Sequence, residues 1–537
     1  MTSPLLDTAN TAGWLTRGAR LRGEQTAIIA DKTGQMLTYR ELDAWTDALA
    51  RGLKGIGIGK GTRVLVLVRA GVDLIGLTYA LFKAGAVPVL IDPGMGRKAF
   101  LGCVEQIAPE AFVGIPLGHV IRLLFPGSFR SVKTVVTAGT RLFWGGPTLS
   151  ALAATPGDPP MARVTGEDEA AILFTSGSTG PAKGVVYTHG MFNAQVRELK
   201  AIYDFQPGEI DLAAFPLFSL FDLAFGMTSV IPDLDPSKPG KCDPAKVGRA
   251  LVRHKCTTAF GSPAIWRRVA PWALASGVTF PGVKRILIAG AAVPPSLIEA
   301  LHQCLPDGDV GTPYGATESL PVANHWGKDI VAKTAKASRE GLGTCVGKPA
   351  PGITVRILEV TDGPLPEWSG VKVLPAGEIG EITVQGDVVT RVYANRPEAN
   401  AAAKVRQTGP HGVEVIWHRV GDLGYLDHEG LLWFCGRKSE RVVTSEGTLY
   451  TDCVEGAVSP MCDGRRIALV GLGPRGSERA AMVVEGGREA TVEARLREQG
   501  FDVFFYEAFP VDVRHNAKIH RLQLKAWAEQ QVAVARR

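Results

Sequence analysis

The chain has 537 residues, a formal net charge of +6 and a pI near 8.8. This length corresponds to roughly three to four domain-sized units, which excludes a single hydrophobic core. Apolar residues make up 45% and charged residues 21% of the chain, a composition typical of a soluble globular protein. The basic residues are scattered, whereas a nucleic-acid-binding protein usually concentrates them on one element. We therefore expect no nucleic-acid partner.

Cysteine usage and the start of the chain bear on its location. The eight cysteines form no C-x-x-C pair, so neither a zinc site nor a dithiol redox motif is predicted. The segment Met1–Gly13 lacks the apolar core of a signal peptide. These features favour free thiols in a reducing, cytoplasmic compartment.

Two segments bear on contact with a membrane. The apolar stretch Val64–Ile91 contains three charged residues, so we expect no membrane span. The segment His119–Phe125, with Arg130 and Lys133 nearby, is the closest approach to a basic patch. It is compatible with peripheral membrane contact, but a solvated edge of a helix is the favoured interpretation.

The first part of the chain alternates strands and helices. Thr38 and Glu41 form a capping box that predicts the start of a helix. A strand, a helix and a strand are then predicted over Arg63–Val68, Val72–Lys83 and Val87–Ile91. This succession is typical of a βαβ unit with parallel strands. A strand over Lys284–Ala289 and a helix over Pro294–Leu305 repeat the scheme, which indicates a doubly wound α/β core.

The pattern of predicted secondary structure changes after about Gly343. Short strand-like runs alternate with turn signals, which suggests an antiparallel sheet or a small barrel. The polar segment Gly436–Glu440 follows a predicted strand and is interpreted as a linker. We therefore expect a first domain over residues 1–438 and a small α+β domain over residues 439–537.

The strongest local motif runs from Thr175 to Gly184. Its glycines let a backbone approach a phosphate closely, while its hydroxyls and lysine donate hydrogen bonds and a positive charge. An ordinary Gly/Ser surface loop is the alternative. It is not a Walker loop, because Gly184 follows the lysine and a strand continues over Val185–Thr188. The predicted phosphate-binding residues are Thr175, Ser176, Gly177, Ser178, Thr179, Gly180 and Lys183.

This loop resembles the phosphate signature of the acyl-adenylate-forming enzymes. Five further segments resemble other motifs of that family and occur along the chain in the family's order. They are Leu37–Leu42, Leu81–Ala86, Tyr314–Glu318, Gly421–Tyr425 with Gly436–Arg437, and Asn516–Ile519. The resemblance covers nearly the whole chain. It implies an α/β fold with a large N-terminal domain of two doubly wound sheets plus a small β-barrel-like subdomain, followed by a small mobile α+β C-terminal domain.

The resemblance also implies catalytic roles. ATP would be a substrate, and a carboxylate would attack its α-phosphorus while pyrophosphate leaves. Glu318 is similar to the family's magnesium-binding glutamate, and Mg²⁺ prefers such oxygen ligands. Thr317 would donate its hydroxyl to the α-phosphate, and Lys518 would bridge the attacking carboxylate and the phosphate. Asn516 stands where the family has glycine, and asparagine tolerates the same left-handed backbone.

Other matched residues are expected to hold the nucleotide. Tyr314, followed by Gly315, would pack on the adenine. Asp422 would accept hydrogen bonds from the ribose, and Arg437 would also reach the nucleotide. The segment that resembles the other adenine wall is Gly290, Ala291 and Ala292.

The apolar run Phe215–Phe225 stands where the family builds its acyl pocket, and a fatty or other aliphatic acid suits it better than an amino acid. The alternative is that these side chains simply fill the core. The expected pocket residues are Phe218, Ser219, Phe221 and Gly261. Three residues depart from the commonest pattern: Ser219, Thr312 and Ser439. Ser219 and Ser439 weaken the case for a second step that uses CoA, and Thr312 leaves adenine recognition to backbone contacts.

Four segments resemble one branch of the family most, the olefin β-lactone synthetases of bacterial hydrocarbon biosynthesis: Phe215–Asp222, Ile231–Pro236, Thr312–Glu318 and Leu432–Arg437. The resemblance implies adenylation of a 2-alkyl-3-hydroxy fatty acid, whose 3-hydroxyl then displaces AMP and closes a β-lactone. It also implies other pathway enzymes as partners, namely a thiolase-like enzyme, a reductase and a lactone decarboxylase.

Three alternatives stay open. A fatty acyl-CoA synthetase would carry the same core motifs. A nucleotide-binding protein that has lost catalysis is a second alternative, although Glu318 and Lys518 are both present. A scaffold in a pathway assembly is the third, and it is compatible with activity.

Overall fold

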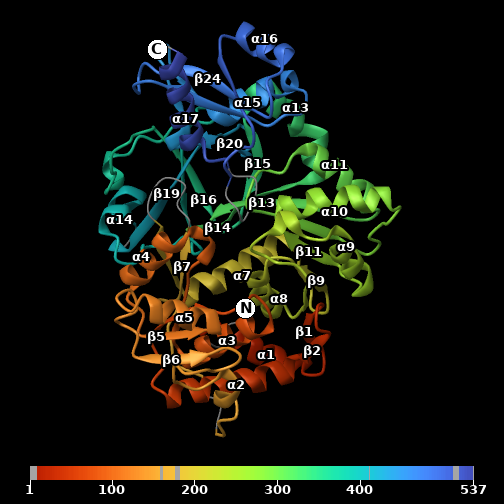
Figure 1. Cartoon of the computed structure of the whole chain (residues 1–537), viewed down its shortest axis with the longest axis vertical. Helices are drawn as coiled ribbons and strands as arrows, with labels where there is room; N and C mark the ends of the chain where they lie inside the picture. Colours follow the sequence, from red (N-terminus) through yellow and green to blue (C-terminus); the bar gives the residue numbers. More distant parts are fainter. Residues whose placement is uncertain (1–8, 158–160, 176–181, 410–411, 512–518, 536–537) are drawn as a thin grey trace.

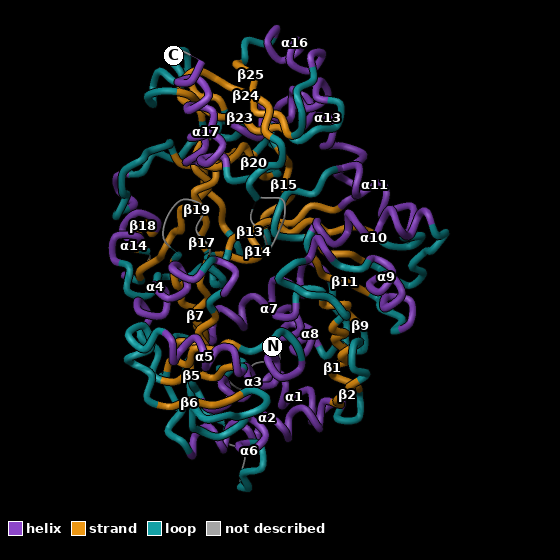
Figure 2. Tube along the Cα trace, viewed as in Figure 1, coloured by secondary structure: helices purple, strands orange, loops and turns teal. Residues whose placement is uncertain are grey.

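A computed structural model describes residues 9–157, 161–175, 182–409, 412–511 and 519–535. The N-terminal elements lie at the lower end of the view in Figure 1, and the C-terminal elements lie at the upper end. Figure 2 shows helices on the flanks of the strands in the lower part and a strand-rich region above them.

The first sheet has the strand order β6-β5-β3-β4-β7-β8. Its strands pair in parallel from β6 to β7, and the β7–β8 pair is antiparallel. The elements of this region are α2 (Tyr39–Gly55), β3 (Arg63–Leu67), α3 (Val72–Ala84), β4 (Val87–Leu90), η1 (Pro93–Met95), α4 (Arg97–Ile107), β5 (Ala111–Gly114), α5 (Pro116–Leu124), β6 (Thr134–Thr137), α6 (Leu149–Leu152), β7 (Glu169–Thr175) and β8 (Lys183–Thr188). The predicted βαβ unit is confirmed as β3, α3 and β4.

The capping box at the start of α2 is also confirmed. The Thr38 hydroxyl accepts a hydrogen bond from the Glu41 backbone N–H at 3.2 Å, and the Glu41 carboxylate accepts one from the Thr38 N–H at 2.8 Å. Two N–H groups that the first turn would leave unpaired are thus satisfied locally.

A buried ion pair joins α2 to α3. Lys83 is fully buried, and its Nζ lies 2.6 Å from Oδ1 of both Asp43 and Asp47, which are four residues apart on α2. Gly76 lets the helices approach, because a Cβ there would lie 1.9 Å from the Trp45 ring. The buried ion pair and the close approach at Gly76 therefore both stabilise the contact between α2 and α3.

Replacing Lys83 by methionine is expected to lower the free energy of unfolding by about 3 kcal/mol, because two largely buried carboxylates lose their shared cation. Denaturant unfolding followed by tryptophan fluorescence measures this loss. Lys98→Met, at an exposed position on α4, is the matched control and should change stability by less than about 0.5 kcal/mol. Equal transitions for the two variants would contradict the role given to Lys83.

The second sheet begins with the order β2-β1-β10-β9-β11-β12-β13, and it is parallel except at the β1–β2 pair. Its largest core cluster surrounds the fully buried Trp266. Its elements are α1 (Gly13–Arg22), β1 (Thr26–Ala30), β2 (Gln35–Thr38), α7 (His189–Tyr203), β9 (Ile210–Ala213), η2 (Pro216–Phe218), α8 (Ser219–Phe225), β10 (Thr228–Ile231), η3 (Pro239–Lys241), α9 (Pro244–Arg253), β11 (Thr258–Gly261), α10 (Pro263–Ala275), β12 (Arg285–Ile288), α11 (Pro295–Cys304) and β13 (Asp309–Ala316).

The antiparallel strands after residue 343 continue the second sheet. β14 pairs with β13 on one side and with β15 on the other, and β20, β19, β17 and β16 follow in order. The elements are β14 (Ser319–Trp326), α12 (Gly327–Asp329), η4 (Ile330–Thr334), α13 (Ala335–Ala337), η5 (Ser338–Leu342), β15 (Thr344–Pro349), β16 (Thr354–Leu358), η6 (Trp368–Gly370), β17 (Gly380–Gln385), α14 (Pro397–Ala403), β18 (Lys404–Thr408), β19 (Glu414–Leu426) and β20 (Leu432–Arg437).

The C-terminal part has its own small sheet, β23-β24-β25. Alternate residues of β23 belong to two different core clusters, so both faces of this sheet are covered. α15 and α16 contribute to one cluster and α17 to the other. The elements are η8 (Lys438–Glu440), β21 (Val442–Val443), β22 (Thr448–Leu449), α15 (Thr451–Val458), η9 (Ser459–Cys462), β23 (Ile467–Leu472), β24 (Arg479–Glu485), α16 (Ala490–Glu498), β25 (Asp502–Tyr506) and α17 (Arg521–Ala535).

Across the described ranges, no helix combines the length and hydrophobicity that crossing a membrane would require.

Candidate functional site

The predicted catalytic pair lies at a tight turn between β13 and β14. Ala316 and Ser319 are paired across the two strands, so Thr317 and Glu318 are the two residues of the turn. β13 is the last parallel strand of the second sheet, and the turn follows its carboxyl end. Ligands of open α/β sheets bind beyond the carboxyl ends of the strands, so the turn is well placed for a site.

Glu318 is held by residues that lie far from it in sequence. Tyr393 donates its hydroxyl to Oε1 of Glu318 at 2.8 Å. Two ammonium groups lie near the Tyr393 ring, with Lys183 Nζ at 5.0 Å and Lys404 Nζ at 5.4 Å from its centroid. We call Lys183, Glu318, Tyr393 and Lys404 the Tyr393 cluster. It places two cations beside one carboxylate, as an anionic ligand requires.

The backbone keeps this cluster in register. Tyr393 forms an isolated antiparallel bridge with Val185 of β8, which attaches its segment to the first sheet. Tyr187, also on β8, donates its hydroxyl to the backbone oxygen of Thr317. The first sheet and the turn of the second sheet therefore contact each other at the site.

Lys404 is the most deeply buried cation of the cluster. Its ammonium group donates to the backbone oxygen and the hydroxyl of Thr390. Burial lowers its pKa to about 7, while nearby Glu318 acts in the opposite direction. The charge of Lys404 in the free protein thus changes near neutral pH.

The value of kcat/KM for ATP is therefore expected to fall as pH rises through about 7. Above that pH Lys404 is mainly neutral in the free enzyme, and kcat/KM reports the ionisation of free species. Pyrophosphate release at subsaturating ATP between about pH 6 and 9 measures the profile. Lys404→Arg stays charged and should lose this fall, whereas the ionisation of ATP itself is common to both enzymes. Identical pH profiles of kcat/KM for the unchanged enzyme and for Lys404→Arg would contradict the assignment of this fall to Lys404.

A second group of paired side chains lies on the same hairpin and on β19 and β20. Tyr314 donates its hydroxyl to Asp422 Oδ2 at 2.6 Å, and Arg437 Nη1 lies 3.0 Å from Asp422 Oδ1. Asp422 and Arg437 are paired residues of β19 and β20. We call these three residues the Asp422 cluster. Burial, and then the Asp422 charge, raise the pKa of Tyr314, so its hydroxyl stays a donor.

The adenine-wall segment follows the carboxyl end of β12 (Arg285–Ile288), and Tyr314 lies near the carboxyl end of β13. β12 and β13 are parallel neighbours, with Leu287 opposite Gly311, so the two segments leave the same edge of the sheet. Gly290 has a φ of +99°, a left-handed conformation that glycine adopts without strain. Ala291 and Ala292 follow at partly open positions, and Gly315 is also exposed.

The predicted phosphate loop is described at its two ends. Thr175 and Lys183 are paired across β7 and β8, which confirms that the loop joins two antiparallel strands. The predicted site residues of the loop and of the terminal motif that lie outside the described residues are Ser176, Gly177, Ser178, Thr179, Gly180 and Lys518.

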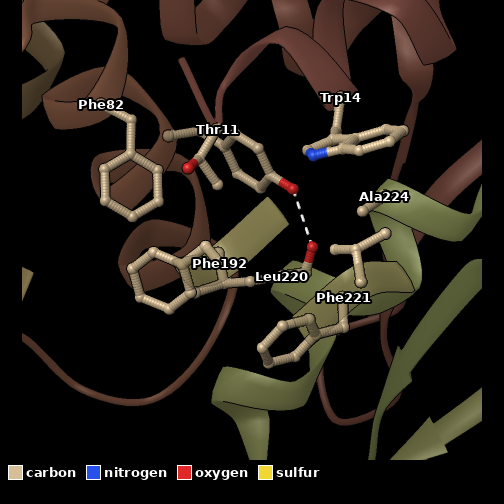
Figure 3. A pocket seen from close by; sticks show the side chains of 9 residues that line it. Thr11, Trp14, Phe82, Phe192, Leu220, Phe221 and Ala224 are labelled. Atoms are coloured by element: carbon tan, nitrogen blue, oxygen red, sulfur yellow. Dashed lines mark hydrogen bonds between the residues drawn. The ribbon is translucent and has the colours of Figure 1, made fainter. Parts of the chain in front are cut away.

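The expected acyl-pocket residues divide into two groups. Phe221 lines a small apolar cavity together with Tyr79, Phe82 and Phe192, and the hydrogen bond between the Tyr79 hydroxyl and the Leu220 backbone oxygen lies at its edge (Figure 3). The cavity has a volume of about 20 Å³, which is on the order of the space that one water molecule needs.

The other expected pocket residues do not line this cavity. Phe218 stacks face to face on Phe260, with ring centroids 4.2 Å apart. Ser219 is fully buried, and its hydroxyl accepts a hydrogen bond from Ser229 at 2.8 Å. Gly261 ends β11. These contacts are equally compatible with a filled core, the alternative interpretation of this segment.

Glu318 is the only expected metal ligand, and its surroundings fit Mg²⁺. Within the described residues no hydrogen bond reaches Oε2, and no group of three His, Cys, Asp or Glu side chains forms a metal cage. Mg²⁺ is commonly held by one carboxylate plus waters and substrate phosphates. The donor set therefore suits a metal that arrives with ATP.

Sequence reasoning missed Tyr187, Tyr393 and Lys404. Tyr393 and Glu318 are separated by 75 residues, and no local spacing links them. Lys404 starts β18 without any pattern that marks it as buried. The run Tyr393–Pro397 before a helix was the only available signal, and it indicates a helix start.

Comparison with known proteins places the chain in a family. The family described as "AMP-binding enzyme" matches residues 15–394. A Stenotrophomonas maltophilia protein named "Olefin beta-lactone synthetase" is 47% identical over 508 residues, which cover 92% of this chain and 91% of that protein. A Xanthomonas campestris protein of the same name is 45% identical over 552 residues, covering 97% of this chain and 98% of that protein.

A solved structure supports the fold. The amide bond synthetase McbA from Marinactinospora thermotolerans has a TM-score of 0.78 at 22% identity, over 96% of this chain and 99% of that chain. The expected architecture of a large N-terminal and a small C-terminal domain is thereby confirmed. Together with the two close relatives, these findings show that the chain belongs to the AMP-binding enzyme family and is an adenylate-forming ligase.

Proposed function

We propose that the enzyme adenylates a long-chain 2-alkyl-3-hydroxy fatty acid and then closes it to a β-lactone. The observation that carries this proposal is the near full-length similarity to two proteins named olefin beta-lactone synthetase. The Tyr393 cluster and the Asp422 cluster, which meet the β13–β14 hairpin at Glu318 and Tyr314, would supply the charges that the first step needs.

In the first step a carboxylate oxygen of the acid attacks the α-phosphorus of ATP, and pyrophosphate leaves. The negative charge of the phosphates must be neutralised as the bond forms. Lys183 and Lys404 lie beside the ring of Tyr393, whose hydroxyl binds Glu318, and the Glu318 carboxylate would hold Mg²⁺. Thr317 would donate to the α-phosphate, and Lys518 would bridge it to the attacking carboxylate.

The nucleoside would lie along the Asp422 cluster. Asp422 is fixed by Tyr314 and Arg437, so its carboxylate is positioned to accept hydrogen bonds from ribose hydroxyls. Tyr314 and the Gly290–Ala292 segment would face the two sides of the adenine. The phosphate loop from Thr175 to Lys183 would close over the phosphates.

In the second step the substrate's 3-hydroxyl attacks its own acyl carbon and loses its proton. AMP leaves with the bridging oxygen, and the products are a β-lactone, AMP and pyrophosphate. An intramolecular nucleophile has a high effective concentration, which offsets the strain of the four-membered ring. Ser219 and Ser439, which depart from the commonest pattern of the family, support a step without an external thiol.

We also propose the domain division at residues 438/439, with Lys518 supplied by the smaller, mobile domain. A cytoplasmic location is supported by the eight cysteines, all of them free thiols. The other enzymes of a hydrocarbon pathway are the partners that the proposed product implies.

Incubation of the enzyme with ATP, Mg²⁺ and a 2-alkyl-3-hydroxy acid tests the proposal, and the expected result is a β-lactone without any CoA. A fatty acyl-CoA synthetase, the remaining alternative, would release a product only when CoA is added. The matched 2-alkyl acid without the 3-hydroxyl is the control: it should be adenylated but give no lactone. A product that requires CoA would overturn the proposal.

A further inference from the structure

Helix α5 presents an apolar stripe outside the site described above. Leu117, Val120, Leu123 and Leu124 are 64%, 38%, 43% and 66% exposed. Their spacing places all four on one face of the helix. The opposite face is packed on the first sheet, because a Cβ at Gly118 would lie within 3.0 Å of Leu67 and Phe112. The stripe is therefore turned outward by the packing of the helix.

The loop over residues 140–146 is anchored on the same helix and carries two further exposed apolar side chains. The Trp144 ring stacks on His119 of α5, with centroids 4.9 Å apart and planes 3° apart, and its Nε1–H donates to Thr137 at 2.9 Å. His119 and Leu123 are one turn apart on α5. The anchored loop also carries Leu142 and Phe143, which are 57% and 81% exposed, and the Phe143 ring contacts Trp144 with centroids 5.4 Å apart.

The segment that carries the stripe has an unusual charge distribution. Residues 111–157 contain no Asp or Glu and four cations, Arg122, Arg130, Lys133 and Arg141. Since 53 of the 537 residues are acidic, about five acids would be expected in a segment of this length. Arg130, Lys133 and Arg141 are exposed. The segment that carries the apolar stripe is therefore purely basic in its charged residues, and three of its four cations are exposed.

We propose that α5 and the loop over residues 140–146, the α5 face, dock on the surface of a bilayer that contains anionic phospholipids. Leucine and phenylalanine side chains enter the acyl boundary of a bilayer, and neighbouring lysine and arginine side chains attract anionic headgroups. A nine-residue helix lies in the interface plane and does not span it. This function goes beyond the reaction and does not depend on the proposed substrate.

Co-sedimentation of the full chain with vesicles tests the proposal. We expect binding to phosphatidylcholine vesicles that contain phosphatidylglycerol, weaker binding to pure phosphatidylcholine, and a decrease at high salt. The double variant Leu123→Glu, Leu124→Glu should weaken binding by at least about tenfold. Leu21→Glu, at a 63% exposed position on α1, is the matched control and should bind as the unchanged enzyme does.

A second double variant tests how much the basic side chains contribute to vesicle binding. Arg130→Gln with Lys133→Gln keeps every apolar side chain, and it should reduce binding only to the vesicles with phosphatidylglycerol. Pyrophosphate release without vesicles should be unchanged in all variants, which shows that they are folded. The proposal is overturned if the enzyme binds neither vesicle, or if Leu21→Glu is as weak as the double variant. A concentration-dependent dimer that the double variant abolishes, without vesicle binding, would instead assign the face to a second copy.

Discussion

Glu318→Gln is expected to slow pyrophosphate release by about 10³-fold, because the substitution removes the carboxylate that we propose to hold Mg²⁺ against the phosphates. The amide keeps the shape of the side chain and can still accept the Tyr393 hydroxyl, so the turn should keep its geometry. The loss should appear mainly in kcat, since charge on the phosphates is greatest in the transition state.

Two matched variants sharpen this test. Tyr393→Phe removes the hydroxyl that orients Glu318 but keeps the carboxylate, and about a tenfold loss is expected. Glu299→Gln, at an exposed position on α11, should leave the rate unchanged. ATP–pyrophosphate exchange measures all three. If Glu318→Gln kept more than a tenth of the rate, Glu318 would not be the metal ligand.

Lys518→Ala is expected to reduce adenylation by about 10³-fold. Lys518 lies outside the described residues, and its role rests on the terminal motif and on the chemistry of the first step. A carboxylate that approaches a triphosphate meets strong repulsion, and a bridging ammonium group removes it. Single-turnover formation of the acyl-adenylate measures the effect directly.

The second half-reaction separates this role from a loss of folding. The variant should still convert a chemically prepared acyl-adenylate to lactone, because no carboxylate–phosphate bond has to form. Lys525→Ala is the control, since Lys525 belongs to the same small domain and its Nζ is bonded to Glu478 at 2.6 Å. Loss of lactone formation from the prepared adenylate would show that Lys518 is not confined to the first step.

The sequence pattern was sufficient to predict those elements whose structure is determined by residues close together in the chain. The capping box at Thr38 and the strand–helix–strand succession from Arg63 depend on residues within a few positions of each other, and both are confirmed. The Tyr314–Glu318 motif covers the end of β13 and the two-residue hairpin turn that follows it, which is also a local structure. The family motifs could therefore be matched residue by residue.

Contacts between segments that are distant in the chain could not be predicted from local sequence patterns. The Tyr393 cluster joins β8, the β13–β14 turn and the start of β18 through a hydroxyl and two ammonium groups. Burial, which a local pattern does not show, lowers the pKa of Lys404. Lys183 was expected only as a phosphate ligand, and its position over the Tyr393 ring follows from tertiary packing. Likewise, nothing in the pattern of β15 shows that it pairs with β14 and extends the second sheet.

Oxygen tracing tests the central claim most directly. A 2-alkyl-3-hydroxy acid with ¹⁸O in both carboxylate oxygens is incubated with the enzyme, ATP and Mg²⁺, and the products are analysed by mass spectrometry. If the carboxylate attacks the α-phosphorus and the 3-hydroxyl then displaces AMP, one ¹⁸O atom is found in AMP and the other in the lactone carbonyl. Unlabelled AMP, or ADP in place of AMP, would contradict the account.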